Sequence, residues 1–157
     1  MLDLVLVGGG LANGLIAWRL LMTRPDVSFA LIEAGPTVGG NHTWSFHGTD
    51  VTAAQLEWLW VLCSRSWPAH DVVFQGDVRR IGGGYHSIRS EDFHLKLSEQ
   101  LKDRLRLRTR VQELSSTSVL LESGERLEAR AVVDGRGFTA EPPYRRGYQR
   151  FLGMDVE

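Results

Sequence analysis

Residues 2–33, LDLVLVGGGLANGLIAWRLLMTRPDVSFALIE, decide the fold that this sequence predicts. The apolar run over 2–7 is typical of a buried strand, and it leads directly into three consecutive glycines. Apolar residues then recur with helical spacing over 11–23, and a Pro-containing turn follows. A second apolar strand over 27–32 ends at Glu33. The order strand, glycine turn, helix, strand and acid predicts a βαβ unit in an α/β fold.

Each part of this unit predicts one contact to a dinucleotide. Gly8 allows the tight turn out of the strand, and Gly10 lets a pyrophosphate approach the backbone because it has no side chain. The helix that follows directs free N–H groups and its positive end at that phosphate. Glu33 lies where an acid hydrogen-bonds the ribose, which favours FAD or NAD over NADP. Asn13 occupies the place of the usual third glycine, and Gly14 follows it. A glycine turn with a purely structural role is the alternative.

Length and composition limit the other possibilities. The chain has 157 residues, 43% of them hydrophobic and 24% charged, which suits one ordinary globular domain. Its formal net charge of −1 gives no electrostatic reason to expect nucleic acid as a partner. Cys63 is the single cysteine, the first residues lack the pattern of a secretory leader, and the apolar runs are too short to span a bilayer. We therefore expect a cytoplasmic protein.

The rest of the chain predicts strands and a helix that return to the first sheet. The expected elements are extended pieces over 78–81 and 85–88 around a glycine turn, a helix over 92–104 capped by Ser90, a strand over 105–114, a hairpin made by 119–121 and 126–127, and a buried strand over 131–133. Together they predict a small β-meander and one discontinuous domain, in which 1–40 is joined by 78–137. Trp58 and Trp60 lie in an apolar helical stretch, 55–62, for which core packing and contact with a membrane or an apolar substrate both stay open.

A second glycine pair, Gly39-Gly40, follows the ribose acid and leads into the polar and aromatic loop 41–47. This arrangement resembles the flavoproteins related to glutathione reductase, in which the segment lies along the dinucleotide toward the isoalloxazine ring. We therefore expect a Rossmann-like FAD-binding domain of that type. His42 is expected either to donate a hydrogen bond near the flavin or to have a structural role. His42 and His47 lack further ligands at a suitable spacing, so we expect no metal site.

Several whole segments are more specific than the fold. They are DLVLVGGGLANGLIA over 3–17, LIEAG over 31–35, GGNHTWSFH over 39–47, VVDGRG over 132–137 and GYQRFLG over 147–153. These segments resemble the bacterial lycopene β-cyclases of carotenoid biosynthesis nearly from end to end, and Asn13 in place of glycine fits that family. The VVDGRG run also resembles a loop that approaches the flavin phosphate and ribityl chain in flavoprotein monooxygenases.

The resemblance implies a function. It implies an FAD-dependent, non-redox cyclisation of the ends of lycopene to β-rings, which gives γ-carotene and then β-carotene. It also implies that FAD acts in its reduced form after reduction by NAD(P)H, that the substrate is a carotenoid, and that the protein contacts a membrane surface peripherally. A flavin-dependent oxidoreductase or monooxygenase on the same fold, and a non-catalytic dinucleotide-binding fragment, are the alternatives.

The predicted cofactor-binding residues combine the spacing argument with this resemblance. They are Gly8, Gly10, Leu11, Ala12, Glu33, Ala34, Gly40, Asn41, His42, Arg89, Val111, Asp134 and Gly135. Members of the family continue well past this sequence, so the resemblance implies that the chain is an N-terminal part with most of the substrate domain missing. The acid that donates the proton is then expected beyond Glu157, and the chain alone is expected to be inactive.

Overall fold

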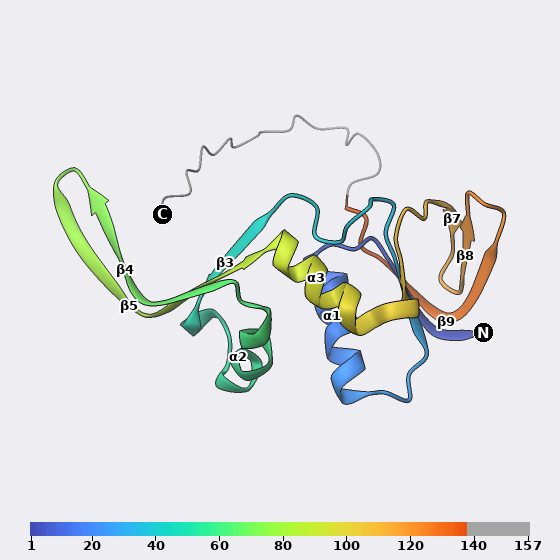
Figure 1. Ribbon diagram of the computed structural model, residues 1–157, viewed down its shortest axis with the longest axis horizontal. Helices are drawn as coiled ribbons and strands as arrows, with labels where there is room; N and C mark the ends of the chain where they lie inside the picture. The colour runs from blue at the N-terminus through green and yellow to red at the C-terminus, as the bar shows by residue number, and fades with distance from the viewer. Residues whose placement is uncertain (138–157) are drawn as a thin grey trace.

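Two sheets organise residues 1–137, the part of the chain that the structure describes (Figure 1). The structure is a computed structural model. The larger sheet consists, in spatial order, of β6 (Leu105–Arg106), β2 (Phe29–Ile32), β1 (Leu2–Val7), β9 (Arg126–Asp134), β8 (Ser118–Leu121) and β7 (Val111–Leu114). The smaller sheet consists of β3 (Thr43–His47), β5 (Asp77–Arg89) and β4 (Arg65–Phe74). The helical segments are α1 (Leu11–Thr23), α2 (Ala53–Leu59) and α3 (Ser90–Leu101), with 3₁₀ turns η1 (Gly48–Asp50), η2 (Trp60–Leu62) and η3 (Lys102–Arg104).

The predicted βαβ unit is confirmed, since β1 and α1 have the predicted bounds and β2 runs parallel to β1. The second strand is shorter than predicted, because the backbone of 27–28 still belongs to the turn that follows α1. Parallel pairing aligns Val7 with Ile32 on one side and with Asp134 on the other. Three strands therefore end at the same edge of the sheet, and this edge carries the candidate site.

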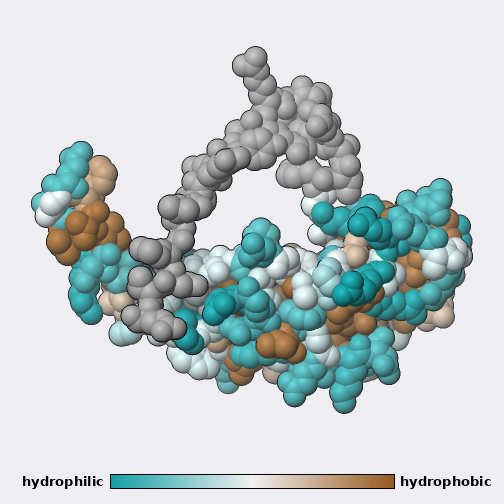
Figure 2. Space-filling view, turned by 45° about the horizontal axis from the view of Figure 1, so that its top comes forward, coloured by the Kyte–Doolittle hydropathy of each residue, from teal (hydrophilic) through white to brown (hydrophobic). Residues whose placement is uncertain are grey.

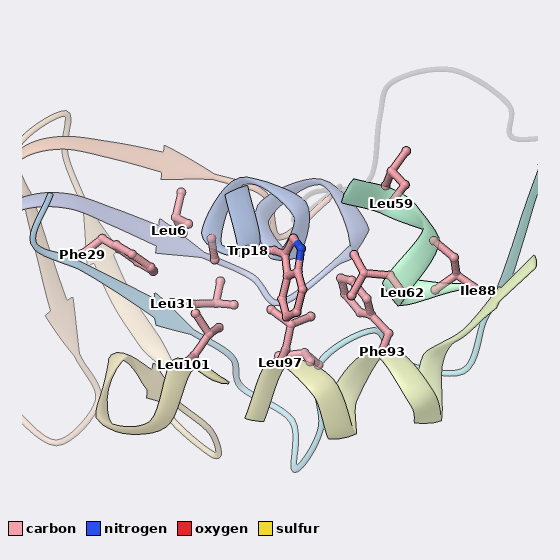
Figure 3. Close-up of a cluster of buried hydrophobic side chains, with 12 residues drawn as sticks. Leu6, Trp18, Phe29, Leu31, Leu59, Leu62, Ile88, Phe93, Leu97 and Leu101 are labelled. Atoms are coloured by element: carbon pink, nitrogen blue, oxygen red, sulfur yellow. The ribbon is translucent and has the colours of Figure 1, made fainter. Parts of the chain in front are cut away.

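Alternation along β1 divides the core into two layers. Leu6 points to the side that α1 and α3 cover, whereas Val5 and Val7 point to the side closed by the β-meander. Figure 3 shows Leu6 and Leu31 of the sheet facing side chains of both helices. Because both faces are covered, Val5 to Val7 of β1 and all four residues of β2 are apolar and buried.

Gly14 lets α1 and α3 pack closely. A Cβ at this position would lie 2.5 Å from the ring of Phe93, which is fully buried between the helices and the small sheet. The ring also meets Trp44 edge-on, with centroids 5.5 Å apart. Burial of such a side chain stabilises a fold by about 2–3 kcal/mol. The glycine after Asn13 thus supplies the close helix packing for which the third glycine of the fingerprint is needed.

β9 is one continuous strand rather than the two short pieces predicted over 126–127 and 131–133. Its first residues pair antiparallel with β8, as the predicted hairpin requires, and its later residues pair parallel with β1. The polar residues Glu128 and Arg130 interrupt the apolar pattern within the strand, which is why the sequence suggested a break. The strand joins the β-meander to the parallel sheet.

The predicted strand over 105–114 is wrong, because its two ends lie at opposite edges of the sheet. β6 pairs with β2, and β7 pairs with β8. Between them the backbone turns at Arg108, whose φ is 53°, and crosses the ends of the strands. The N–H groups of Arg108 and Thr109 donate to the carbonyls of Gly35 and Glu33, both at 2.9 Å. These tertiary hydrogen bonds, and not the alternation of Leu and Arg, decide the path.

The glycine triplet 82–84 does not form the predicted turn, because β5 runs through it and pairs with β4, a strand that was not predicted. The register shifts between Trp67 and Ala69, and across from this bulge Gly83 and Gly84 adopt φ values of +93° and +86°. Glycine adopts such angles without strain, so a β-bulge explains the triplet. Figure 1 shows the resulting hairpin projecting away from the rest of the described chain.

Three further expectations need correction. The loop predicted over 41–47 is a strand from Thr43 onward, since it pairs with β5. The predicted helix 92–104 is α3 followed by η3, and the stretch 55–62 is α2 followed by η2. Ser90 is not the N-cap, because the helix begins at this residue and its hydroxyl accepts a hydrogen bond from the His42 N–H instead (3.2 Å).

No helix in the described part of the chain is both long and apolar enough to span a lipid bilayer.

Candidate dinucleotide-binding site

The site lies where β1, β2 and β9 end side by side. The Gly8 N–H donates to the Ile32 carbonyl at 2.8 Å, and the Gly135 N–H donates to the Val7 carbonyl at 2.7 Å. The turn after each strand is therefore tied to the neighbouring strand. Ligands of open α/β sheets bind outside this edge of the sheet, so the three turns form the expected place for a dinucleotide.

Gly8 and Gly10 are required for different reasons. Gly8 has a φ of +93°, and a Cβ there would lie 2.8 Å from backbone atoms of Gly135 and Arg136. A Cβ on Gly10, in contrast, would meet no atom of the described chain within 4 Å. Gly8 thus shapes the turn, whereas Gly10 leaves open space directly in front of α1. This open space is what a pyrophosphate needs in order to approach the backbone.

The N-terminus of α1 faces this space. Leu11 and Ala12 form its first turn, where backbone N–H groups have no partner within the helix. The first turn contains no acidic side chain, so the positive end of the helix dipole is not offset by the helix's own residues. The fit to a phosphate group is therefore both steric and electrostatic.

Asn13 holds the edges of the site together. Its side chain is buried, and Nδ2 donates to the carbonyls of Val7 (2.9 Å) and Gly8 (3.0 Å). Gly135 lies so close to the Asn13 amide that a Cβ at 135 would overlap it. The Asn13 amide, at the position of the usual third glycine, thus fixes the turn after β1 by hydrogen bonds. The sequence pattern alone did not reveal this role.

Glu33 is fixed by two short hydrogen bonds. Oε2 accepts from the Gly9 N–H and Oε1 accepts from the Gly35 N–H, both at 2.6 Å. Each carboxylate oxygen has a second lone pair, so the group can still accept hydrogen bonds from two ribose hydroxyls. A negative charge at this position also disfavours a phosphorylated ribose.

Two adjoining cavities follow the sheet edge. A cavity of about 190 Å³ is lined by Val7, Gly8, Ile32, Glu33, Ala34, Thr109, Val111 and Arg136. An open groove of about 380 Å³ is lined by Gly8, Gly9, Gly10, Glu33, Gly35, Pro36, Thr37, Gly39, Gly40, His42, Gly135 and Arg136. Both have Gly8, Glu33 and Arg136 in their walls. They therefore form one extended path. It runs from an apolar end at Val111, past Glu33 and the open space in front of Gly10, to His42.

Arg136 forms part of the wall between the cavities. Its Nε and Nη2 donate to the two carboxylate oxygens of Asp134, both at 2.9 Å. These hydrogen bonds lower the pKa of the Asp134 carboxyl from its ordinary value. The contribution of the pair to stability is therefore present above pH ~4 and is lost as the pH falls through the lowered pKa. Because the side chains are 31% and 39% exposed, the pair adds little stability and mainly orients the guanidinium.

Comparison with known proteins identifies the family. A family model described as lycopene cyclase protein matches residues 3–157. The chain belongs to the lycopene cyclase family. A lycopene beta-cyclase of Pseudescherichia vulneris is 51% identical over 154 residues, and one of Pantoea ananas is 44% identical over 153 residues. Each match covers 98% of this chain and 40% of the relative. The chain thus spans about two fifths of the length of these relatives.

Solved structures show where this cyclase-family fold occurs elsewhere. A probable FAD-dependent monooxygenase of Pseudomonas aeruginosa is 18% identical with a TM-score of 0.63, over 83% of this chain and 41% of its own. The p-nitrophenol 4-monooxygenase of Pseudomonas putida is 16% identical with a TM-score of 0.65, over 85% and 40%. At such identities the likeness concerns the fold alone. The chain therefore has an α/β fold that is shared with these monooxygenases.

The structure brings most of the predicted cofactor residues to this path. Those in the cavity walls are Gly8, Gly10, Glu33, Ala34, Gly40, His42, Val111 and Gly135. Leu11 and Ala12 follow Gly10 in the first turn of α1, Asn41 is exposed between two wall residues, and Asp134 holds Arg136. Arg89 is the one predicted residue that lies away from the path. Its exposed side chain places Nε 3.7 Å from Oε2 of Glu91, and it is not part of either cavity wall.

Several wall residues of this cyclase chain were not among those predicted. Gly9, Gly35 and Gly39 belong to the glycine pattern that the sequence displays, so closer attention to it would have found them. Arg136 stands within the VVDGRG segment, next to two predicted residues. Thr109 reaches the site only through the link between β6 and β7, for which the sequence carries no local pattern.

The single cysteine, Cys63, is not part of either cavity wall. Burial raises the pKa of the Cys63 thiol, whose Sγ contacts the Leu59 carbonyl at 3.6 Å, so its environment does not favour a nucleophilic thiolate. Within residues 1–137, no three His, Cys, Asp or Glu side chains are arranged to hold a metal ion.

We expect the substitution Glu33→Gln to weaken this edge of the sheet. The amide has one acceptor oxygen, so one of the N–H groups of Gly9 and Gly35 must face an amide donor. Loss of a charge-assisted hydrogen bond predicts a stability decrease of about 1.5–3 kcal/mol. FAD affinity should fall about tenfold or more because the ribose contact is weakened as well. Thermal unfolding and flavin fluorescence titration measure the two effects.

Glu99→Gln is the matched control, since Glu99 is exposed on α3 and lies outside both cavities. It should leave both quantities at the parental values. Parental FAD affinity in the Glu33→Gln variant would contradict the assignment of Glu33 to the ribose.

Proposed function

We propose that this chain is the FAD-binding part of a lycopene β-cyclase. The observation that carries the proposal is the family match over residues 3–157, together with relatives that are themselves named lycopene beta-cyclase. The reaction proposed is the non-redox closure of the ends of lycopene to β-rings, giving γ-carotene and then β-carotene. The extended path along the sheet edge supports a dinucleotide cofactor, and the flavin-dependent fold neighbours support FAD.

Within this proposal each part of the path has one role. The apolar end at Val111 takes the adenine, Glu33 takes the ribose, and the space before Gly10 takes the pyrophosphate. His42 marks the end toward the flavin ring, and two hydrogen bonds fix its backbone: its N–H donates to the Ser90 hydroxyl, and its carbonyl accepts from the Ser90 N–H. When bound and reduced by NAD(P)H, FAD supplies negative charge next to a developing carbocation.

The domain organisation is part of the same proposal. Residues 1–40 and 78–137 form one discontinuous FAD-binding domain of the type related to glutathione reductase. The parallel pairing of β9 with β1 supports this, because it returns the end of the second segment to the sheet of the first. The expectation that 78–88 also returns to that sheet is wrong, because β5 pairs with β3 and β4 in the small sheet. The acid that donates the proton is placed beyond Glu157, in the part of the protein that corresponds to the remaining length of the relatives, and the present chain alone is therefore proposed to be inactive.

Peripheral contact with a lipid bilayer is also proposed, since the proposed substrate is a membrane-dissolved hydrocarbon. Figure 2 shows apolar surface at the free end of the β4–β5 hairpin. Val73 and Val78 pair on one face of this tip, Val72 and Phe74 lie on the other, and Val73, Phe74 and Val78 are 67–69% exposed. A tip that is apolar on both faces suits insertion into lipid better than packing against a single surface. Trp60, which is 53% exposed, is less suitable because its ring also packs against His86.

A flavin-dependent oxidoreductase is the second candidate, because the solved structures with this fold include a probable FAD-dependent monooxygenase. The two candidates differ in electron balance. A cyclase consumes no NAD(P)H in proportion to product, whereas a monooxygenase consumes one equivalent for each turnover. The identity of 51% to a lycopene beta-cyclase favours the first candidate.

A chimaera tests the proposal, with this chain replacing the matching segment of the Pseudescherichia vulneris relative. We expect the purified chimaera to show a flavin absorption spectrum and to convert lycopene into cyclic carotenes anaerobically with reduced FAD. The relative itself is the positive control. In a parallel assay in air with NAD(P)H, oxygenated products with stoichiometric NAD(P)H oxidation would replace the cyclase proposal with the oxidoreductase. Bound FAD without any product would assign this chain a binding role only.

A further inference from the structure

The small sheet has one covered face and one open face. On the covered face, the His86 ring lies 5.1 Å from Phe46 and 5.5 Å from Trp60 of η2, measured between ring centroids. Alternation along β3 and β5 places His47 and Tyr85, the next pair in register, on the opposite face. Figure 1 shows α2 below this sheet, whereas the segment that enters β3 lies above it.

Four rings gather on the open face, and we call His47, Trp67, His70 and Tyr85 the ring cluster. The Tyr85 centroid lies 4.8 Å from His70, 5.2 Å from His47 and 6.1 Å from Trp67. The two imidazoles are 5.2 Å apart. The rings come from all three strands of the small sheet. The β-bulge between Trp67 and Ala69 adjusts the register of β4 here, so that His70 reaches the Tyr85 ring.

The ring cluster is not part of the apolar core. None of its members belongs to either buried hydrophobic cluster, and Trp67 is 44% exposed. In the described part of the chain, the Nδ1 atom of His70 is shielded from solvent and has no hydrogen-bond partner. Trp18 Nε1 and His86 Nε2, in the packed part of the fold, lack partners as well, so it is the exposure of Trp67 that distinguishes the ring cluster from the core.

The ring cluster continues the cofactor path. The groove ends at Gly40 and His42, and β3 starts at the next residue. His47 follows His42 by five residues, which is about 16 Å along an extended strand. The open face of the small sheet, the one away from α2, is therefore the next surface along the chain from the flavin end of the groove.

We propose that the ring cluster binds the reacting end of the apolar substrate and stabilises the cation formed during ring closure. This inference rests on the proposed cyclase function. Ring closure that begins with protonation of a double bond places a positive charge on carbon. Because no anionic side chain belongs to the ring cluster, its rings themselves must interact with this charge. The faces of Trp67 and Tyr85 attract a cation through their quadrupoles while they also contact hydrocarbon. His47 and His70 flank Tyr85 and hold its ring in place.

Substitutions in the chimaera test this role. Tyr85→Leu and Trp67→Leu should each lower the rate of lycopene cyclisation about tenfold or more, because a cation–π contact is lost. Tyr85→Phe retains the ring and should keep most of the rate. The matched control is Trp60→Leu, which removes a ring that is 53% exposed on the covered side of the same sheet, outside the ring cluster. The flavin spectrum should be the same in all four variants, because none of these residues lines the groove.

A second measurement does not depend on turnover. A tertiary amine with a prenyl tail and a photoreactive diazirine imitates the cation and its hydrocarbon. Irradiation with the FAD-loaded chimaera should label the tryptic peptides 66–79 and 81–89 near Trp67, His70 and Tyr85. Labelling should decrease in the Trp67→Leu/Tyr85→Leu double variant and persist in Trp60→Leu.

The outcomes separate this inference from the proposed function. Cyclisation at the parental rate in Tyr85→Leu and Trp67→Leu, with no label in the two peptides, would overturn the inference and leave the cyclase function intact. Labelling of the ring cluster without any conversion of lycopene would support the binding surface and contradict the cyclase function. Absence of both in a chimaera that binds FAD would overturn both.

Discussion

Replacing Gly8 by alanine is expected to abolish FAD binding and to destabilise the fold by about 2–4 kcal/mol. Two causes add at this position. The backbone has a φ of +93°, which L-residues rarely adopt, and the new methyl group would lie 2.8 Å from backbone atoms of Gly135 and Arg136. Backbone cannot move aside as a flexible side chain can, so the turns after β1 and β9 must separate. Chemical denaturation and flavin titration measure the two losses.

Gly10→Ala is the informative control for this prediction. Its φ is −70°, and the added Cβ meets no atom of the described chain within 4 Å, so stability should stay within about 1 kcal/mol of the parent. FAD affinity should still fall, because the methyl group occupies the space assigned to the pyrophosphate. If Gly10→Ala bound FAD like the parent, the phosphate would have to lie elsewhere.

The substitution Asn13→Asp should be the second most damaging change, with an expected loss of about 3 kcal/mol or more. The new side chain has the same shape, but it offers no N–H to the carbonyls of Val7 and Gly8, which now accept from Nδ2 at 2.9 and 3.0 Å. A buried carboxylate would instead face two carbonyl oxygens. Thermal unfolding of the variant at several pH values measures the effect.

The pH dependence of this loss has a definite sign. Burial next to acceptors raises the pKa of the introduced carboxyl above its unfolded value, so the deficit grows as the pH rises above that value. It should be smaller in mild acid, where the protonated acid donates one hydrogen bond. Asn41→Asp makes the same chemical change at an exposed position and should leave stability nearly unaltered. A pH-independent deficit at position 13 would show that the carboxylate escapes to solvent.

Local sequence determined the first half of the large sheet. Apolar periodicity and glycine placement predicted β1 and α1 with their observed bounds, because strand and helix periods are properties of neighbouring residues. The same pattern located Gly8, Gly10 and Glu33 at the end of the strands. Longer segments such as GGNHTWSFH over 39–47 resemble the lycopene cyclase family, to which the family match assigns the chain.

Contacts between distant segments decided the rest. The segment 105–114 was split between two edges of the sheet by hydrogen bonds to Glu33 and Gly35, and this brought Thr109 into the site. The glycines at 83 and 84 became part of a β-bulge because β4 was available to pair with them. In both cases the partner lies far along the sequence from the segment whose structure it decides, so local pattern could not predict the pairing.

Individual side chains show the same division. The sequence by itself determined that position 13 is an asparagine and that positions 47, 67, 70 and 85 carry aromatic or imidazole rings. Only the tertiary structure showed that the Asn13 amide clamps the ends of β1 and that the rings meet around Tyr85. Residue type sets what a group can donate, accept or stack upon, but the folding of separate strands into register decides which groups come within reach of one another.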